Sequence, residues 1–467
     1  MNALALAAAA VLQLPAPSPD SVETLRDNAR SVEAEFERLA RRLAPIKFSS
    51  MNGTQCDEIV GRFCLRYDVG EMPEPPAEPS RVVTARRMAI EALRHAFTYL
   101  AEQFDTSGPL VRYLVEDDRA REAVSAARTF DLLSGDTIWG PLLLGFALHA
   151  ATEDTAAEHQ YALALGRLPE EERREIEDVE WLLSHSDRGV YGDGDDAERE
   201  RYEAALWAFA DPLYLTPGNE RRNQHIARHV WSRALERAPV VGGMVRWGRD
   251  LEQLTVRYGI PAGRTRSPGS AWRDGSLVEH FDPDQLAYVP EDLLTDGAPP
   301  TPPPGETWTL ENPRNRSGFA PATIRRLEPM SHQITRIPLG ESTTLRVDGV
   351  ATLDSVAAGA DSVRLGFWVV ADGDRFIVER RAAATSDRDT VRLTFHAPVS
   401  PGTYLYSAEA FEPASRLGAR ARYSVEIPAP TGRILLSDPL VAEPFRTGAL
   451  PASLTDNALR PRASLVL

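Results

Sequence analysis

The sequence predicts a multi-domain protein of the α plus β class. In residues 81–186 the apolar side chains recur at helical spacing, and few segments there resemble strands. From residue 332 onward apolar and polar residues alternate, which is the pattern of half-buried strands. Proline-rich segments at 72–79 and 298–304 separate these regions. A chain of 467 residues agrees with about three domains, since domains average roughly 150 residues.

The first residues indicate export. An apolar run at 3–14 ends in the proline-rich segment 15–19, as expected of a signal peptide spanning residues 1–19. No Lys or Arg precedes this run. The run is too short to cross a bilayer as a mature helix, and no other segment is apolar enough, so we expect no transmembrane span in the mature chain. The expected location is the periplasm or the outer envelope.

Residues 20–80 predict one helix, a cysteine loop and a hinge. Apolar residues at three- and four-residue steps indicate a helix over 21–43. The two cysteines of the chain, Cys56 and Cys64, match no short metal-binding or redox spacing. In an oxidising compartment they favour a local disulfide; the alternative is two free thiols packed in a small core. The proline-rich segment 72–79 is expected to form an extended hinge.

Residues 81–186 contain a sequence repeat. A window of roughly 34 residues from Ile138 resembles the tetratricopeptide repeat, and an earlier window from about Phe104 matches it weakly. The residues expected to pack this repeat are Leu144, Gly145, Ala157, Tyr161, Ala164 and Pro169. Small side chains allow two antiparallel helices to approach closely, the tyrosine fills the gap beside them, and the proline ends the second helix. The region is therefore expected to be a tetratricopeptide-like α-solenoid, the alternative being a generic helical bundle.

The segment after this region is the most distinctive part of the chain. Residues 187–196 are rich in Asp and Gly but lack the residue order of a calcium loop, so we expect a solvated turn. Residues 211–223 read Asp-Pro-Leu-Tyr-Leu-Thr-Pro-Gly-Asn-Glu-Arg-Arg-Asn, and a helix carrying His225 and His229 follows. A Trp-x-x-Asp motif then leads into an expected strand over 251–258.

The order of these motifs resembles the GWxTD domain over residues 203–288. Trp247 and Asp250 match the motif that names the family, whereas Arg246 and Arg249 replace its Gly and Thr. The resemblance implies a bacterial envelope-associated protein, in which such a domain often follows tetratricopeptide-like helices and precedes a β-sandwich. The predicted domains, besides the repeat region 81–186, are the signal peptide 1–19, the segment 20–80, a GWxTD-like domain 196–297, a linker 298–331, an immunoglobulin-like sandwich 332–444 and a tail 445–467.

Candidate binding residues gather in this segment. They are Asn219, Glu220, Arg222, Asn223, His225, Trp247 and Asp250. His225 and His229 lie four apart and face one side of a helix, which makes them weak candidates for metal ligands with Glu220 upstream. A zincin needs Glu directly after the first His, where Ile226 stands. The alternative is structural: the polar residues join the helix start to the following strand, Asn219 caps the helix, and Trp247 lies in a core.

The last third of the chain predicts an immunoglobulin-like sandwich. Six or seven short strands within roughly 100 residues are typical of that fold. The expected strands cover residues 343–347, 362–369, 375–378, 391–395, 402–410 and 419–427. The motif Ala371-Asp372-Gly373-Asp374 predicts a hairpin between the second and third.

Charge and motifs restrict the function. With 68 acidic and 52 basic residues the net charge is -16, which disfavours nucleic acid as a partner. No P-loop, GxGxxG or GxSxG motif appears in a suitable context, so neither cofactor nor catalytic residues are expected. The leading hypothesis is an exported interaction or scaffolding protein that binds an unidentified protein. The alternatives are a metal-dependent hydrolase or metal-binding protein centred on 219–250 and a carbohydrate- or peptidoglycan-binding protein, which would need an exposed aromatic row on the sandwich.

Overall fold

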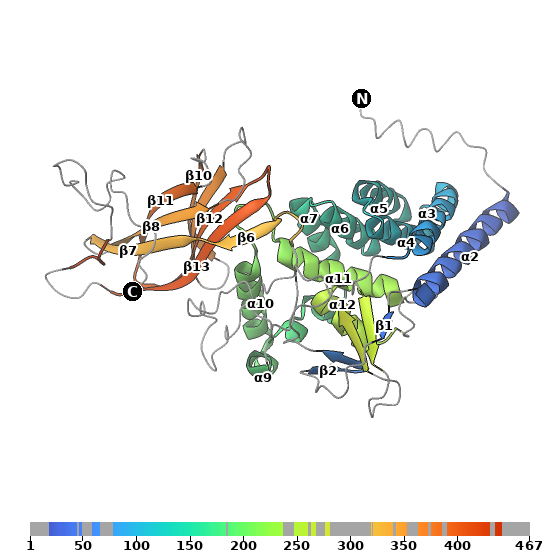
Figure 1. The fold of residues 1–467 in the computed structure, drawn as a ribbon, viewed down its shortest axis with the longest axis horizontal. Helices are drawn as coiled ribbons and strands as arrows, with labels where there is room; N and C mark the ends of the chain where they lie inside the picture. The colour runs from blue at the N-terminus through green and yellow to red at the C-terminus, as the bar shows by residue number, and fades with distance from the viewer. Residues whose placement is uncertain are drawn as a thin grey trace. The chain divides into compact units, whose positions relative to one another are not determined.

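The chain forms two compact units. The computed structural model describes residues 18–43, 46–48, 58–65, 78–183, 185–236, 247–259, 263–267, 276–280, 319, 321–339, 342–352, 363–371, 375–384, 390–429 and 435–440. Unit 1 comprises Met1–Trp181, Arg222–Gln285 and Pro313–Ala320, and unit 2 comprises Leu182–Arg221, Leu286–Asn312 and Pro321–Leu467. Most helices lie in the N-terminal part of the chain, and the larger β-sheets lie in its C-terminal part (Figure 1). This confirms the predicted α plus β class.

Unit 1 begins with a series of helices, most of which pack against the next helix along the chain. They are α2 Pro19–Leu43, α3 Ser80–Leu100, α4 Phe104–Glu116, α5 Ala120–Ser134, α6 Trp139–Ala150, α7 Asp154–Leu165 and α8 Glu170–Glu177, with the 3₁₀ turn η1 Glu180–Leu182 after them. Gly135 ends α5 in the left-handed conformation, with a φ of 64°, which glycine adopts without steric cost. Helix α6 is buried from Gly140 to His149, as expected of a helix that is apolar all round.

A second part of unit 1 contains a small mixed sheet and two helices. Its strands are β1 Ile46–Phe48, β2 Glu58–Val60, β3 Phe63–Leu65, β4 Gly263–Ser267 and β5 Ser276–His280, in the order β1-β4-β5-β3-β2. β1 pairs with β4 and β3 with β5 in parallel, whereas β2–β3 and β4–β5 are antiparallel. The helices are α11 Glu220–Glu236, which belongs to unit 1 from Arg222 onward, and α12 Arg249–Tyr258.

Two local predictions in this region were wrong. Residues 251–258 form the helix α12 instead of a strand, because Leu251, Leu254 and Tyr258 recur at helical spacing and all three are buried. Residues 187–196 were expected to be a turn, but most of them belong to the helix α9 His185–Asp193. The capping box of Asp195 and Glu198 then begins α10, as this arrangement satisfies backbone N–H groups at a helix start.

Unit 2 contains α9, α10 Asp196–Ala210 and two sheets. The first sheet has the order β10-β9-β12-β13-β6 and the second β11-β8-β7. The strands are β6 Arg326–Pro329, β7 Ser331–Leu339, β8 Ser342–Thr352, β9 Val363–Ala371, β10 Arg375–Ala384, β11 Thr390–Val399, β12 Gly402–Glu412 and β13 Leu417–Ile427. The six strands expected from alternation are all present, and β9 pairs antiparallel with β10 as a hairpin requires.

Alternate residues of the two sheets share one apolar core. It includes Leu345, Val347, Phe367, Val369, Leu393 and Tyr406. This is the consequence of the period of two, since every second side chain of a strand points to the same face.

The observed units do not follow the predicted boundaries. Residues 196–297, expected to form one domain, are divided between the two units. Strands from the 20–80 segment pair with strands of residues 263–280, and β6 lies within the expected linker 298–331. Parallel pairing joins segments that are distant along the chain, so local patterns could not indicate it. Cys56, and with it the predicted disulfide to Cys64, the greater part of the signal peptide and the tail 445–467 lie outside the described residues.

Candidate functional site

Helix α11 packs against the helical array of unit 1 through its apolar residues. Ile226, Ala227 and Val230 belong to the same apolar core as the helices α3 to α7. The ring of Trp231 lies edge-on to Phe146, with 5.7 Å between the ring centroids. Helix α11 therefore takes part in the core of these helices and contacts α6 through this ring pair.

Polar contacts fix the start of α11 to the turn between α6 and α7. The Nδ1 atom of His149 lies 2.7 Å from Asp154 Oδ1, and its Nε2 atom lies 2.5 Å from Gln224 Oε1. Asn223 Nδ2 donates to the side chain and the backbone oxygen of Asp154, each at 3.1 Å. Both nitrogens of the buried His149 ring are therefore engaged, so this ring orients two helices and has no nitrogen left for a ligand.

His225 and His229, the weak metal candidates, are part of the same packing. Their rings lie at a steep angle with 4.7 Å between centroids. His225 Nε2 lies 3.0 Å from the backbone oxygen of Ile176, and His229 stacks parallel to Trp181 with 6.4 Å between centroids. Burial, with a smaller effect of the Arg233 cation, lowers the pKa of His229 to about 3. Within the described part of the chain, no group of three or more His, Cys, Asp or Glu side chains is placed to hold a metal ion.

Asp250 holds α12 to the β2–β3 hairpin. Its Oδ2 atom accepts from Arg62 N at 3.1 Å and from Arg62 Nε at 2.5 Å, and its Oδ1 atom accepts from Arg62 Nη2 at 2.6 Å. A Cβ at Gly61 would stand 2.5 Å from the Asp250 Cβ, so only glycine fits there. Burial opposes ionisation of Asp250, but the hydrogen bonds from Arg62 outweigh it and hold the pKa of this carboxyl below its ordinary value of 3.8.

A second ion pair and Trp247 complete this contact. Arg257 of α12 donates to both carboxylate oxygens of Glu58 on β2, at 3.0 and 2.9 Å. Trp247 packs against the small core of β2, β3 and α12, which includes Val60 and Phe63. Trp247 and Asp250, the two residues that match the family motif, thus take part in joining the helix to the hairpin.

The remaining candidates make separate contacts. Arg222 Nη2 lies 3.8 Å from Glu177 Oε1 in unit 1. In unit 2, Asn219 Nδ2 donates to the backbone oxygen of Trp207 at 2.7 Å. The Glu220 carboxylate accepts hydrogen bonds from the backbone N–H of Ala322 and from both the backbone N–H and the hydroxyl of Thr323. The seven candidate residues therefore stabilise several different junctions and do not converge on one reaction centre.

Unit 2 contains a buried polar cluster that was not among the candidates from the sequence. Arg422 of β13, which is fully buried, donates to the backbone oxygens of Phe209 and Asp211 at 2.8 and 2.6 Å. It also donates to Glu409 Oε1 at 2.9 Å, and Leu215 N donates to the second oxygen of this carboxylate at 3.1 Å. The segment 211–216 is thereby fixed to the first sheet of unit 2. Burial, against the effect of Arg422, raises the pKa of Asp211 well above its ordinary value.

Alternating polar residues on β12 and β13 were the signal for this cluster. Such a row normally faces water, but here it lies under the segment 211–216. Phe367 lies in the core between the sheets, and the equally buried Trp368 lies edge-on to Tyr214 at 5.6 Å. Neither ring can therefore belong to the exposed aromatic row that a carbohydrate-binding sandwich would need.

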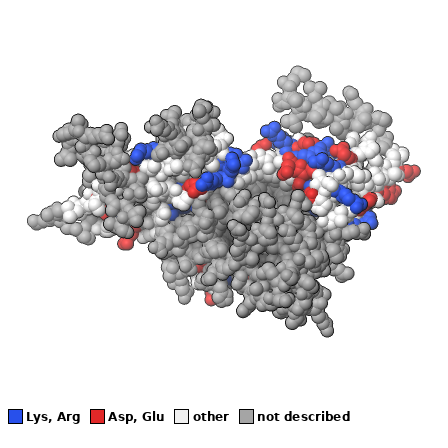
Figure 2. Space-filling view, in the orientation of Figure 1, with Lys and Arg blue, Asp and Glu red and all other residues white. Residues whose placement is uncertain are grey.

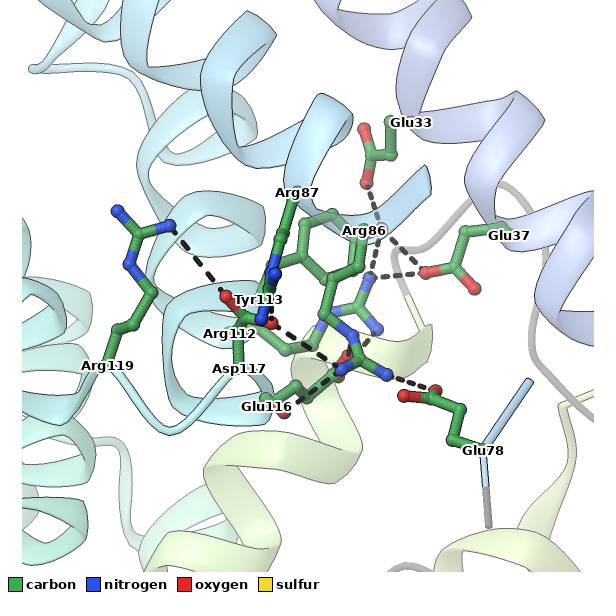
Figure 3. A network of polar contacts seen from close by, with 10 residues as sticks. All are labelled: Glu33, Glu37, Glu78, Arg86, Arg87, Arg112, Tyr113, Glu116, Asp117 and Arg119. Carbon is green, nitrogen blue, oxygen red and sulfur yellow. Dashed lines mark hydrogen bonds and ion pairs between the residues drawn. The ribbon is translucent and has the colours of Figure 1, made fainter. Parts of the chain in front are cut away.

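A third polar cluster joins α2 to α4 in unit 1 (Figure 3). Arg112 Nη2 donates to Glu37 Oε1 and to Tyr113 Oη, both at 2.7 Å. Tyr113 Oη lies 2.6 Å from Glu37 Oε1 and 3.2 Å from Glu33 Oε1. These residues were not among the candidates from the sequence, because single charged residues on helices α2 and α4 have the pattern of a solvated face.

Ion pairs between neighbouring helices continue this cluster to the surface. Arg86 of α3 contacts Glu78, Glu116 and Asp117, and Arg94 of α3 pairs with Glu122 of α5. In the view of Figure 2 basic and acidic side chains lie next to one another over the described surface. The described part of this face thus carries mixed charge.

Comparison of the chain with family models, with curated proteins and with solved structures gives no match. Among the described residues, no helix has both the length and the apolar character that crossing a membrane requires.

Proposed function

We propose that this chain is an exported interaction or scaffolding protein of the bacterial cell envelope. In this proposal residues 81–186 are a short tetratricopeptide-like solenoid, a GWxTD-like segment follows them, and the two sheets of unit 2 form an immunoglobulin-like sandwich. The observation that carries the proposal is the close packing of α6 and α7, in which Gly145 lies against the Tyr161 ring. Helix pairs with such contacts stack into platforms whose faces bind other chains.

Helix α11 supports this assignment because it is itself an amphipathic helix bound to the array. Its apolar residues join the core of α3 to α7, and its polar residues contact the α6–α7 turn. Since α11 occupies part of the array in this way, we expect a partner protein to bind elsewhere on the helices.

Exposed apolar side chains on α3 and α5 indicate that place. Leu132 and Leu133, at the end of α5, are 75% and 52% exposed, and Met88 of α3 is 61% exposed. The ion pair of Arg94 and Glu122 joins α3 to α5. Large apolar side chains at adjacent exposed positions are typical of interaction surfaces, and no stability is gained by leaving them in water.

The test compares the envelope proteins that cross-link to a double variant of α5 with those that cross-link to a single control variant in unit 2. The purified full-length chain is cross-linked in envelope extract, and the joined peptides are identified by mass spectrometry. We expect Leu132→Asp with Leu133→Asp to abolish specific cross-links to residues of α3 and α5. Leu436→Asp, which changes a residue 84% exposed in unit 2, should leave them intact. Equal loss, or equal retention, in both variants would contradict a partner site on these helices.

Export is tested separately on the chain recovered from cells. We expect the mature protein to lie in the envelope fraction and to begin near residue 19, because a signal peptidase cleaves after the apolar run. Cys56 and Cys64 should react with a thiol reagent only after reduction. An intact N-terminus together with two reactive thiols in the cytoplasmic fraction would contradict the proposed location.

A further inference from the structure

Three groups surround the hydroxyl of Tyr113 where α2 meets α4. Arg112 Nη2 lies 2.7 Å from Tyr113 Oη, Glu37 Oε1 lies 2.6 Å from it and Glu33 Oε1 lies 3.2 Å from it. Figure 3 shows Glu33 and Glu37 reaching from α2 toward the two residues of α4. All four side chains are almost fully buried, with exposed fractions of 0 to 5%.

The number of available protons decides how these groups can bond. A tyrosine hydroxyl donates one hydrogen bond, and a guanidinium group only donates. Arg112 donates to the phenol oxygen, and the phenol hydrogen can satisfy one carboxylate, for which Glu37 lies closer. The Glu33 oxygen then faces the phenol oxygen with no hydrogen between them. A proton on Glu33 itself supplies the missing hydrogen. The geometry therefore favours a proton on the Glu33 carboxyl group.

The charges around the pair agree with a proton on Glu33. The charged groups nearest to it come from α2, α3, α4 and the segments flanking these helices, and they are Arg30, Glu78, Arg86, Arg112, Glu116 and Asp117. Arg112 faces three carboxyl groups, because it also lies 3.4 Å from Glu116. Burial, opposed by Arg112 and reinforced by Glu37, raises the pKa of Glu33 from 4.5 to about 7. Burial also raises the pKa of Glu116 to about 7.

We propose that α2 docks on α3 and α4 with uptake of a proton by Glu33, beside Glu37 and Tyr113, so that a rise in pH loosens α2. When α2 separates, the Glu33 carboxyl group enters water and ionises near its ordinary value. In the docked state Glu33 keeps its proton to a higher pH. Docking is therefore strongest below about pH 4.5, weakens about tenfold per pH unit for each proton taken up, and becomes constant again above about pH 7.

The consequence of loosening is exposure of a defined apolar surface. Phe36 of α2 packs edge-on against the Tyr113 ring at 5.0 Å, and Ala29 and Phe36 both belong to the helical core. When α2 separates, the part of α3 and α4 that these residues cover becomes accessible to another chain. This inference does not depend on the function proposed above, because it concerns only the attachment of α2.

Hydrogen exchange of the full-length chain tests the proposal. Protection of the α2 amides, corrected for the intrinsic pH dependence of exchange, is measured from pH 5 to pH 8 beside amides of α6 and α7. We expect the protection of α2 to fall with pH up to about 7, whereas α6 and α7 change little. In Glu33→Gln the fall should be smaller by about tenfold per pH unit, because the amide supplies a hydrogen that does not titrate.

Glu35→Gln is the matched control, since Glu35 lies exposed on the same helix and undergoes the same substitution. It should retain the wild-type dependence on pH. Equal slopes in Glu33→Gln and the wild type, or α2 protection in the wild type that does not fall between pH 5 and 7, would overturn the proposal. The wild-type series decides even if Glu33→Gln does not fold. Infrared spectroscopy at pH 6 gives a second readout, in which the band of protonated carboxyl groups must be weaker in Glu33→Gln than in the wild type, because Glu116 and Asp211 contribute to this band as well.

Discussion

Gly145 of α6 lies directly against the ring of Tyr161 of α7. A Cβ at position 145 would stand 2.6 Å from Tyr161 Cε1 and 2.7 Å from Cδ1, closer than side chains approach one another. Tyr161, Ala157 and Ala164 are all buried on the facing side of α7. The absence of a side chain at residue 145 thus sets how closely these two helices pack.

We predict that Gly145→Ala destabilises unit 1. An alanine in a helix gains about 1 kcal/mol over glycine, but the added methyl group forces the Tyr161 ring to move, and overpacking costs about 1 to 3 kcal/mol. The expected net loss is about 1 kcal/mol in the free energy of unfolding by urea. Gly189→Ala in α9, where nothing lies within 4 Å, is the control and should be neutral or stabilising. A gain of stability in both variants would show that the helices are not closely packed at residue 145.

Asp250 is predicted to matter for attachment of the β2–β3 hairpin. Asp250→Asn keeps the shape of the side chain but removes the charge that accepts three hydrogen bonds from Arg62. Hydrogen bonds to charged groups contribute about 1.5 to 3 kcal/mol, so we expect a loss in that range and faster hydrogen exchange in β2 and β3. Glu252→Gln, two residues along the same helix, serves as the control. Unchanged exchange in Asp250→Asn would contradict the role that we assign to this carboxylate.

The buried pair of Arg422 and Glu409 should show strong coupling in unit 2. Both side chains are fully buried, and removing one partner of such a pair leaves the other charge unpaired at a cost of about 3 to 5 kcal/mol. We expect Arg422→Met and Glu409→Gln each to be strongly destabilising and the double variant to lose less than their sum. The measurement is a double-mutant cycle by urea unfolding. Additive losses would mean that the two groups do not depend on each other.

The buried His229 should make the free energy of unfolding fall in acid, and a single variant should reduce this effect. Burial lowers the pKa of this imidazole from 6.5 to about 3, so the unfolded chain binds a proton between these values and the folded chain does not. The contribution of His229 is complete above about pH 6.5 and is lost by about 1.4 kcal/mol per pH unit as the pH falls toward 3. His229→Gln should reduce this loss between pH 6 and 4.5 when unfolding is measured by denaturant. His159→Gln, a variant of a residue outside this packing, should retain it.

The sequence determined the elements that depend on local periodicity. The strands β8 to β13 followed from alternation of apolar and polar residues, and the helices of 81–182 followed from three- and four-residue spacing. The same rule was misapplied at 251–258, where Leu251, Leu254 and Tyr258 already had helical spacing.

The site residues could be selected from the sequence only as a group. Asn223, His225 and Asp250 were chosen because polar residues in a distinctive motif often act together, yet they contact Asp154, Ile176 and Arg62. Each of these partners lies more than 45 positions away along the chain, where spacing carries no information. For the same reason no sequence pattern indicated the pair of Glu33 and Glu37, because their hydrogen bonding depends on Tyr113, which is distant along the chain.

By itself the sequence determined the helical character of 81–182 and the strands β8 to β13, because hydrophobic periodicity is a property of neighbouring residues. Only the tertiary structure decided that α11 joins the core of α3 to α7, that strands of 46–65 pair with strands of 263–280, and that Arg422 lies under the segment 211–216. Burial converts ordinary surface charges into groups that must be paired, and burial is fixed by contacts between segments distant along the chain.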